Sequence, residues 1–145
     1  MSYWRKPKIL SPKHKISSKQ TKHEAQKKMV TEKKYDLEER TLKFTKACVD
    51  LCKIVVKDVI NLEFIKQLMR ASGSVGANYR EANESMSKKD FYHRIKICRK
   101  EAKESRYWLE ILRHANEKYG EQISGLVDEA TQLTKIFGSI IANQP

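Results

Sequence analysis

Apolar residues recur at intervals of three and four positions from Asp36 onward, in four successive runs separated by short polar stretches. This spacing is typical of helices that bury one face against a core. In the third run the spacing becomes a strict heptad that lasts for three heptads. The heptad positions are Phe91, Ile95, Cys98, Ala102, Ser105, Leu109 and Leu112.

Four amphipathic helices joined by short connections predict an all-α fold, an antiparallel up-and-down four-helix bundle that covers 35–145. Asp36 and Asn61 are residue types that cap helix N-termini, and Ser87 with Asp90 resembles a capping box. Gly120 is expected to stop the third helix. The predicted helices are 36–57, 61–86, 88–118 and 121–143.

The stretch "ASGSVGAN", residues 71–78, gathers two glycines and several small residues. A phosphate-binding Walker loop would need a preceding strand and a Gly-Lys-Ser/Thr ending, and this stretch has neither. Gly73 and Gly76 match the bare GxxG of a KH domain, but that motif sits in a loop. Because the apolar spacing continues through the glycines, we predict a mid-helix segment where another helix or subunit approaches closely.

Residues 1–34 carry eleven Lys/Arg and only two acids, a net charge of +9 out of +12 for the chain. With Pro7 and Pro12 and no sustained apolar spacing, this segment is expected to be a disordered basic arm. It would tether a polyanion electrostatically, with Trp4 or Tyr3 available to stack on a base. The alternative is a solubilising tail without a binding role.

The third predicted helix carries a second stripe, which is basic. Cys98 and Lys100 are separated by a rotation of about 200°, so the basic stripe faces away from the apolar seam. One sign of charge repeated along a helix, with an aromatic residue at its end, fits contact with a phosphate backbone. The alternative is an ordinary solvated lysine face, whose field Glu101 and Glu104 would weaken. The stripe consists of Lys89, His93, Lys96, Lys100, Lys103 and Tyr107, bordered by Arg94, Arg99 and Arg106.

No catalytic or metal-binding constellation emerges from these patterns. Cys48 and Cys52 are four residues apart and Cys98 lies on the third helix, but no histidine within the apolar registers completes a zinc site. A di-iron bundle needs Glu-x-x-His pairs, and Glu110 with His114 has the wrong spacing. We therefore expect buried free thiols, no metal or other cofactor, and no enzyme activity.

No apolar run reaches the roughly 18 residues that span a bilayer, and the N-terminus lacks the apolar segment of a signal peptide. The expected location is therefore cytoplasmic, without a membrane partner.

The block at 72–112 resembles a family of four-helix-bundle proteins first met as reading frames inside intervening sequences of bacterial 23S ribosomal RNA genes. The resemblance extends more weakly over 36–143 and omits the basic arm. It rests most strongly on three motifs: Asn78-Tyr79-Arg80-Glu81-Ala82, Ser87-Lys88-Lys89-Asp90-Phe91 and Glu101-Ala102-Lys103-Glu104-Ser105.

This resemblance implies a bundle that can assemble into a ring-like homopentamer and that has no catalytic role. The sequence is also similar to the accessory protein of diversity-generating retroelements, which works with a reverse transcriptase and nucleic acid through a basic surface. The resemblance further implies that Asn78, Arg80 and Glu81 are structural, bridging helices or subunits.

Two function classes remain open at this point. The first is a nucleic-acid-binding oligomer, in which a ring of subunits multiplies weak phosphate contacts to RNA or DNA. The second is a protein-interaction scaffold that uses exposed apolar residues. The residues predicted for such contacts are Trp108, Ile111 and Ile97, which widen the apolar seam beyond what one core requires.

Overall fold

The computed structural model describes residues 36–145 together with Lys22 and Glu24, so the predicted basic arm lies almost entirely outside the described residues. The described chain is all-helical, as predicted. None of its helices is long and apolar enough to cross a membrane. The elements are α2 (Leu37–Ile54), α3 (Val59–Asn83), α4 (Lys88–Ala115), the 3₁₀ turn η1 (Glu117–Tyr119) and α5 (Gly120–Ala142).

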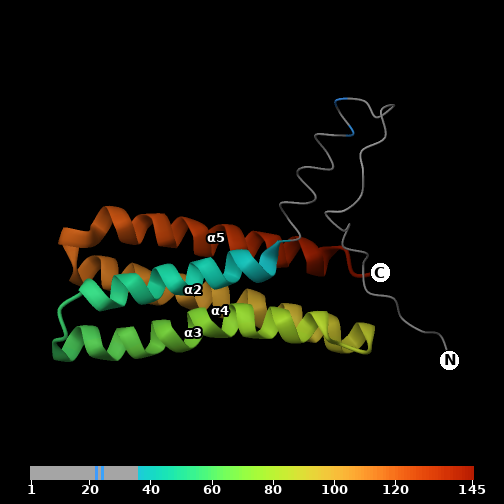
Figure 1. The fold of residues 1–145 in the computed structure, drawn as a ribbon, viewed down its shortest axis with the longest axis horizontal. Helices are drawn as coiled ribbons and strands as arrows, with labels where there is room; N and C mark the ends of the chain where they lie inside the picture. The colour runs from blue at the N-terminus through green and yellow to red at the C-terminus, as the bar shows by residue number, and fades with distance from the viewer. Residues whose placement is uncertain (1–21, 23, 25–35) are drawn as a thin grey trace.

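Consecutive helices run in opposite directions and lie side by side (Figure 1). Helix α4 packs mainly against α3 and α5, and the shorter α2 packs against the same two helices on the opposite side. The exposed face of α4 therefore points away from α2.

The core contains the predicted seams of all four helices. Every heptad position of α4 is buried, and so are Phe44 and Leu51 of α2 and Val75 of α3. In α5 the buried positions are Ile123, Val127, Ala130, Leu133 and Phe137. The apolar spacing therefore identified the inward face of each helix correctly.

The helix bounds differ from the predicted ones by up to three residues: α2 ends at Ile54 and α3 at Asn83, where 57 and 86 were predicted. Two of the differences change the role of a residue. Helix α3 begins earlier than expected, because the side chain of Asp58 accepts a hydrogen bond from the backbone N–H of Asn61 at 2.8 Å and acts as the cap. Asn61 is instead buried within the helix. Gly120 does not stop α4, which ends at Ala115; it has right-handed helical backbone angles and begins α5.

Asn61 pairs with Asn116, which follows α4 at the same end of the bundle. Each amide nitrogen donates to the other side chain's oxygen at 2.9 Å. Each also donates to a backbone carbonyl, that of Val56 for Asn61 and that of Leu112 for Asn116. The pair satisfies its polar groups without water and joins the α2–α3 turn to the end of α4.

The two glycines of α3 have different surroundings. The segment is mid-helix, as predicted. A Cβ at Gly76 would lie 2.9 Å from Oγ1 of Thr41 on α2, so this glycine permits a close approach of the two helices. Among the described residues, Gly73 has no neighbour within 4 Å of a Cβ position, so it makes no close helix contact there, and its predicted subunit contact stays a prediction.

The three cysteines are buried and free, as expected. Burial raises the pKa of the Cys48 thiol from 9.0 to about 12, with the neighbouring Cys52 adding to the shift. Burial also raises the pKa of Cys98 to about 12 and that of Cys52 to about 11. These thiols are therefore protonated core residues at neutral pH.

Replacing each of the two glycines with alanine is expected to change the stability of the bundle in opposite directions. Gly76→Ala is expected to destabilise the bundle by about 1–3 kcal/mol, because its methyl group would collide with the hydrogen-bonded side chain of Thr41. Gly73→Ala is expected to stabilise it by up to about 1 kcal/mol, because alanine restricts the unfolded chain and has room in the helix. Urea unfolding of both variants measures the difference, and equal destabilisation would contradict this account.

The raised pKa values of the buried cysteines lead us to expect that the folded chain loses stability at alkaline pH. Because folding raises their pKa values, their contribution is complete below 9.0 and is lost as pH rises toward 12. At pH 10 the loss is expected to be about 1 kcal/mol for each of Cys48 and Cys98. Urea unfolding between pH 8 and pH 10 measures the slope, and a Cys98→Ala variant should have a shallower one. An unchanged slope in that variant would contradict the assignment.

Candidate nucleic-acid interface

The basic stripe of α4 lies on one exposed face of the helix. All six of its predicted members are exposed, and no carboxylate occupies a stripe position between Lys89 and Tyr107. With a rise of about 1.5 Å per residue, this face extends for about 27 Å. The structure therefore brings together Lys89, His93, Lys96, Lys100, Lys103 and Tyr107.

The bordering arginines differ in how free they are to bind a ligand. Arg99 is exposed and its guanidinium lies close to Gly138 of α5. Arg106 is exposed and forms an ion pair with Glu110 at 3.2 Å. Arg94 is half-buried and donates a hydrogen bond to the side-chain oxygen of Asn78 at 3.1 Å, so it joins α4 to α3. Arg94 therefore belongs to the helix packing more than to the stripe.

Two of the acids near the stripe, Glu101 and Glu104, are turned toward α3, whereas Asp90 and Glu110 lie beside stripe residues in the hollows described below. Glu101 is buried, and its carboxylate lies 3.6 Å from the guanidinium of Arg70 on α3. Glu104 accepts hydrogen bonds from Arg70 and from the indole N–H of Trp108. Because Arg70 offsets both carboxylates on that side, they weaken the field over the lysines less than their sequence positions imply.

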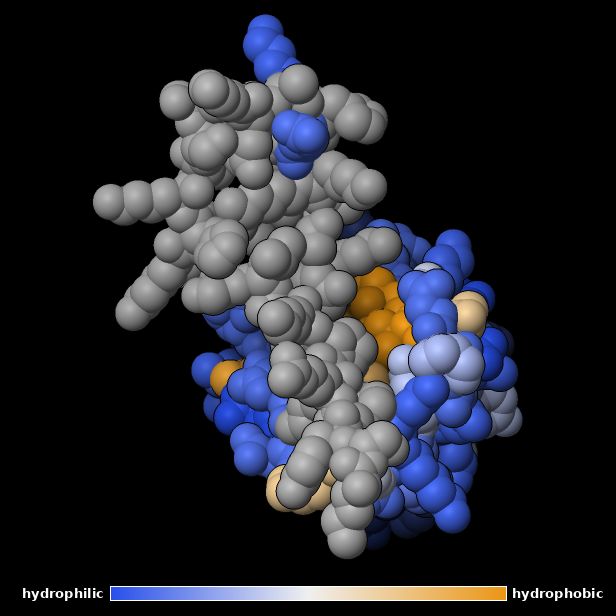
Figure 2. Space-filling model, turned by 90° about the vertical axis from the view of Figure 1, so that its right-hand side faces the viewer, coloured by the Kyte–Doolittle hydropathy of each residue, from blue (hydrophilic) through white to orange (hydrophobic). Residues whose placement is uncertain are grey.

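Two of the hollows along the stripe are lined by its lysines. The first, of about 660 Å³, lies where α4 begins and includes Gln144. Figure 2 views this end of the bundle, and the described surface visible there is mostly hydrophilic, with one large and several small apolar areas. It contains Asp90 as well as cationic side chains. Its lining residues are Lys88, Lys89, Asp90, Tyr92, His93, Lys96 and Gln144.

The second hollow is a groove of about 330 Å³ between α4 and α5. Helix α4 contributes Lys103, Arg106, Tyr107 and Glu110 to it. Helix α5 contributes residues that the sequence reasoning missed: Thr131, Thr134 and Lys135. No pattern along the chain indicates these three, because their position beside Tyr107 depends on the packing of α5 against α4.

The predicted contact residues have mixed outcomes. Asn78 joins α3 to α4 through Arg94, as expected of a helix contact. Glu81 is exposed and lines a third hollow, of about 340 Å³, with Glu84, Arg94 and the stripe residue His93. No bridge from its carboxylate to another helix is found in the described chain. Its role between subunits stays a prediction.

Trp108, Ile111 and Ile97 are half-buried and do not form the exposed apolar stripe that was predicted. Trp108 packs against Phe64 of α3, with ring centroids 6.0 Å apart, and so contributes to helix packing within the chain. Most of the large apolar residues that are exposed in the described chain gather instead at the α2–α3 turn. They are Ile54, Val56, Val59, Ile60 and Leu62.

No cluster of metal-ligating side chains occurs in the part of the chain that the structure describes. Cys48, Cys52 and Cys98 are buried, whereas His93 and His114 are exposed. The cysteines and these histidines are therefore kept apart by the fold.

Comparison with known proteins agrees with the fold and the motifs. A solved structure, that of a protein with unknown function from the S23 ribosomal protein family of Bacteroides thetaiotaomicron VPI-5482, superimposes with a TM-score of 0.66. It is 35% identical, and the alignment covers 72% of this chain and 96% of that one. None of the curated proteins matches this chain.

The family model described as 23S rRNA-intervening sequence protein matches residues 19–139. The matched region includes residues 19–35, so the expectation that the resemblance omits the whole N-terminal arm was wrong. The match covers all of α2, α3 and α4 and most of α5. The chain therefore belongs to the family of 23S rRNA-intervening sequence proteins.

Proposed function

We propose that this protein binds RNA or DNA without catalysing a reaction, through the exposed face of α4. The observation that carries the proposal is the run of six exposed stripe positions that no carboxylate interrupts. Such a run can follow the phosphates of a nucleic-acid backbone, releasing a counterion at each contact. Phosphate contacts hold a strand in place without reading its sequence, so binding is expected to be strongly salt-dependent and weakly selective.

The chemistry of the core supports a binding function over a catalytic one. A nucleophilic cysteine needs a lowered pKa and access to substrate. Cys48, Cys52 and Cys98 are buried and their pKa values are raised. They are unsuited to that role.

Assembly into an oligomer, a pentamer by the family resemblance, would strengthen binding. Each subunit would present its own lysine face, so contacts that are weak singly would add through avidity. The reverse-transcriptase partner implied by the resemblance stays a prediction.

A second candidate function is that of a protein-interaction scaffold. It is favoured by the exposed apolar residues at the α2–α3 turn, where Val59 is 82% exposed and Val56 is 67% exposed. Apolar side chains gathered in this way favour contact with another protein or another subunit. The turn lies at the opposite end of the bundle from the start of α4, so a partner there would leave most of the stripe open (Figure 1).

Reversing the charge of Lys96, Lys100 and Lys103 to Glu is expected to weaken binding of duplex DNA by more than about tenfold near 100 mM salt. The log–log salt slope is expected to become shallower by about 3, because three phosphate contacts are lost. Fluorescence anisotropy across a salt series measures both quantities, on protein freed of bound nucleic acid and on a chain that starts at Tyr35.

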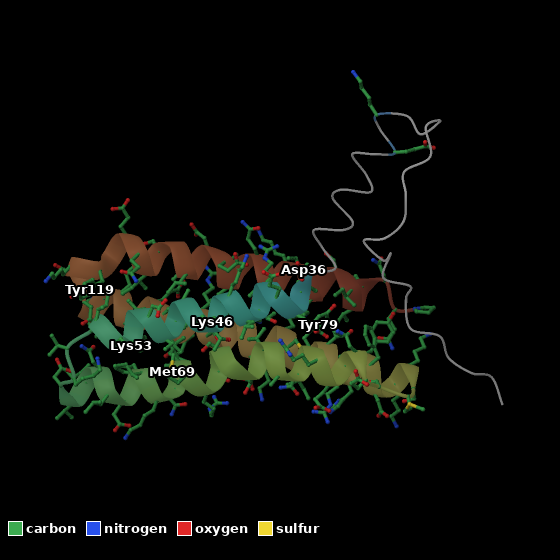
Figure 3. The ribbon with its side chains drawn as sticks, viewed as in Figure 1. Asp36, Lys46, Lys53, Met69, Tyr79 and Tyr119 are labelled. Atoms are coloured by element: carbon green, nitrogen blue, oxygen red, sulfur yellow. The ribbon has the colours of Figure 1, made fainter. Side chains whose placement is uncertain are left out.

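The matched control reverses three exposed lysines elsewhere, Lys46 and Lys53 on α2 (labelled in Figure 3) and Lys66 on α3. It changes the net charge equally but leaves the face of α4 intact. If both triple variants lose affinity to the same extent, net charge is responsible and the interface is wrongly placed. If the unaltered protein does not bind at all, the scaffold function takes its place.

Replacing Val59 and Ile60 with Gln is expected to reduce self-association, because both side chains are exposed and apolar. Light scattering after size exclusion would show a shift toward the 17.0 kDa single chain. Met86→Gln is the control, since Met86 is 91% exposed but lies outside this turn. An unchanged oligomer mass in the double variant would remove the turn from the subunit contact.

A further inference from the structure

The groove between α4 and α5 differs from the rest of the stripe because it contains an exposed aromatic ring. Tyr107 is 57% exposed and lines the groove beside Lys103, Arg106 and Lys135. The volume of the groove, about 330 Å³, is at the lower end of the range for small-ligand sites. A lysine face that served only to contact phosphates would have no use for such a ring.

The ring of Tyr107 is supported from within the bundle. It lies 4.9 Å, centroid to centroid, from the indole of Trp108, with the planes at 68°. Trp108 is fixed in turn by its contact with Phe64 and by its hydrogen bond to Glu104 at 3.3 Å. A supported ring loses little conformational freedom when a ligand stacks on it, so stacking costs less than on a freely rotating side chain.

The opposite wall of the groove offers hydrogen-bond acceptors. The hydroxyls of Thr131 and Thr134 each donate to the carbonyl four residues earlier, both at 2.8 Å. Their protons are thereby used, and their oxygens remain as acceptors. Such a wall suits the N–H edge of a base and disfavours a phosphate, which brings only acceptor oxygens.

The cationic side chains of the groove lie where they could bind the phosphate of a nucleotide whose base stacks on Tyr107. Lys103 and Lys135 come from different helices, and no ion pair is found for either within the described residues. Arg106 is paired with Glu110, so it is less available. A phosphate held by the two lysines would lie beside a base on Tyr107, and the strand could then continue toward Lys100 and Lys96.

We propose that this groove holds an unpaired base, with Tyr107 as its stacking surface, so that the preferred ligand is single-stranded nucleic acid. The inference rests on the nucleic-acid function proposed above and names the substrate class for the same face. In a duplex the faces of each base are covered by its neighbours, so only an unpaired or terminal base can stack on the ring. The backbone of RNA and that of DNA both satisfy the chemistry.

Replacing Tyr107 with Ala tests the groove. Fluorescence anisotropy is measured with labelled single strands of about 12 nucleotides, one of thymidine DNA and one of uridine RNA. A DNA strand of equal length without bases and a duplex serve as comparison ligands. Tyr107→Ala is expected to weaken binding of the base-containing single strands by about 5- to 100-fold and to leave the other two ligands unaffected.

Tyr107→Phe keeps the aromatic face and is expected to keep most of the affinity, which separates stacking from loss of the hydroxyl. Circular dichroism and urea unfolding test whether both variants fold, which is expected because Tyr107 is exposed. If Tyr107→Ala loses more affinity for the RNA strand than for the DNA strand, RNA is the preferred source of the base. If the two losses are equal, the groove accepts a base from either RNA or DNA.

Trp108 provides a second measurement that does not depend on affinity. The chain has two tryptophans, so a Trp4→Phe variant leaves Trp108 as the only one, in contact with Tyr107. A stacked base is expected to change the Trp108 emission at saturating ligand, and the strand without bases is not.

Two results overturn the inference: equal loss on all four ligands, or no loss on the base-containing strands. If duplex and baseless strands still bind with a steep salt dependence in either case, the phosphate-binding face stands and only the base groove is wrong. If the unaltered protein binds none of the ligands at low salt, the nucleic-acid function fails together with the groove.

Discussion

The burial of one face of α4 fixes where its charges point. Cys98 and Ala102 are fully buried between α3 and α5, and a helix cannot turn one residue without turning its neighbours. Lys100 and Lys103 are therefore held outward by the packing of residues that carry no charge. The backbone of this face is as rigid as the core behind it, so the positions from which the lysines extend are fixed before any ligand arrives, and only the exposed side chains must be ordered on binding.

The two sides of the exposed face of α4 differ in charge, so the face is more positive toward α5 than toward α3. Toward α3, Glu101 and Glu104 meet Arg70, so charge is neutralised within the protein. Toward α5, Lys135 adds a cation that the helix itself does not supply. A strand lying on α4 would accordingly favour the α5 side, where Tyr107 lies. Packing between helices thus shapes the surface as much as the composition of α4 does.

The helix faces could be predicted because they depend on spacing within one segment. The rotation between Cys98 and Lys100 suffices to place one inside and the other outside. Contacts between residues of different helices could not be predicted from this spacing. Gly76 differs from the other glycine of its run only because Thr41 of α2 lies against it, and nothing in the order of residues pairs those two. Lys135 was missed for the same reason, since its place in the groove depends on how α5 is aligned with α4.

The reciprocal amide pair of Asn61 and Asn116 has a consequence for folding specificity. Apolar seams tolerate sliding, because one leucine contact resembles the next, and a bundle held by them alone has several alignments of similar energy. A slip of one turn would break both reciprocal hydrogen bonds and leave the side-chain oxygen of each amide without its partner, although the bonds to Val56 and Leu112 could persist, at a cost of about 1–3 kcal/mol for each unsatisfied group. The pair therefore favours a single alignment of the two helical hairpins.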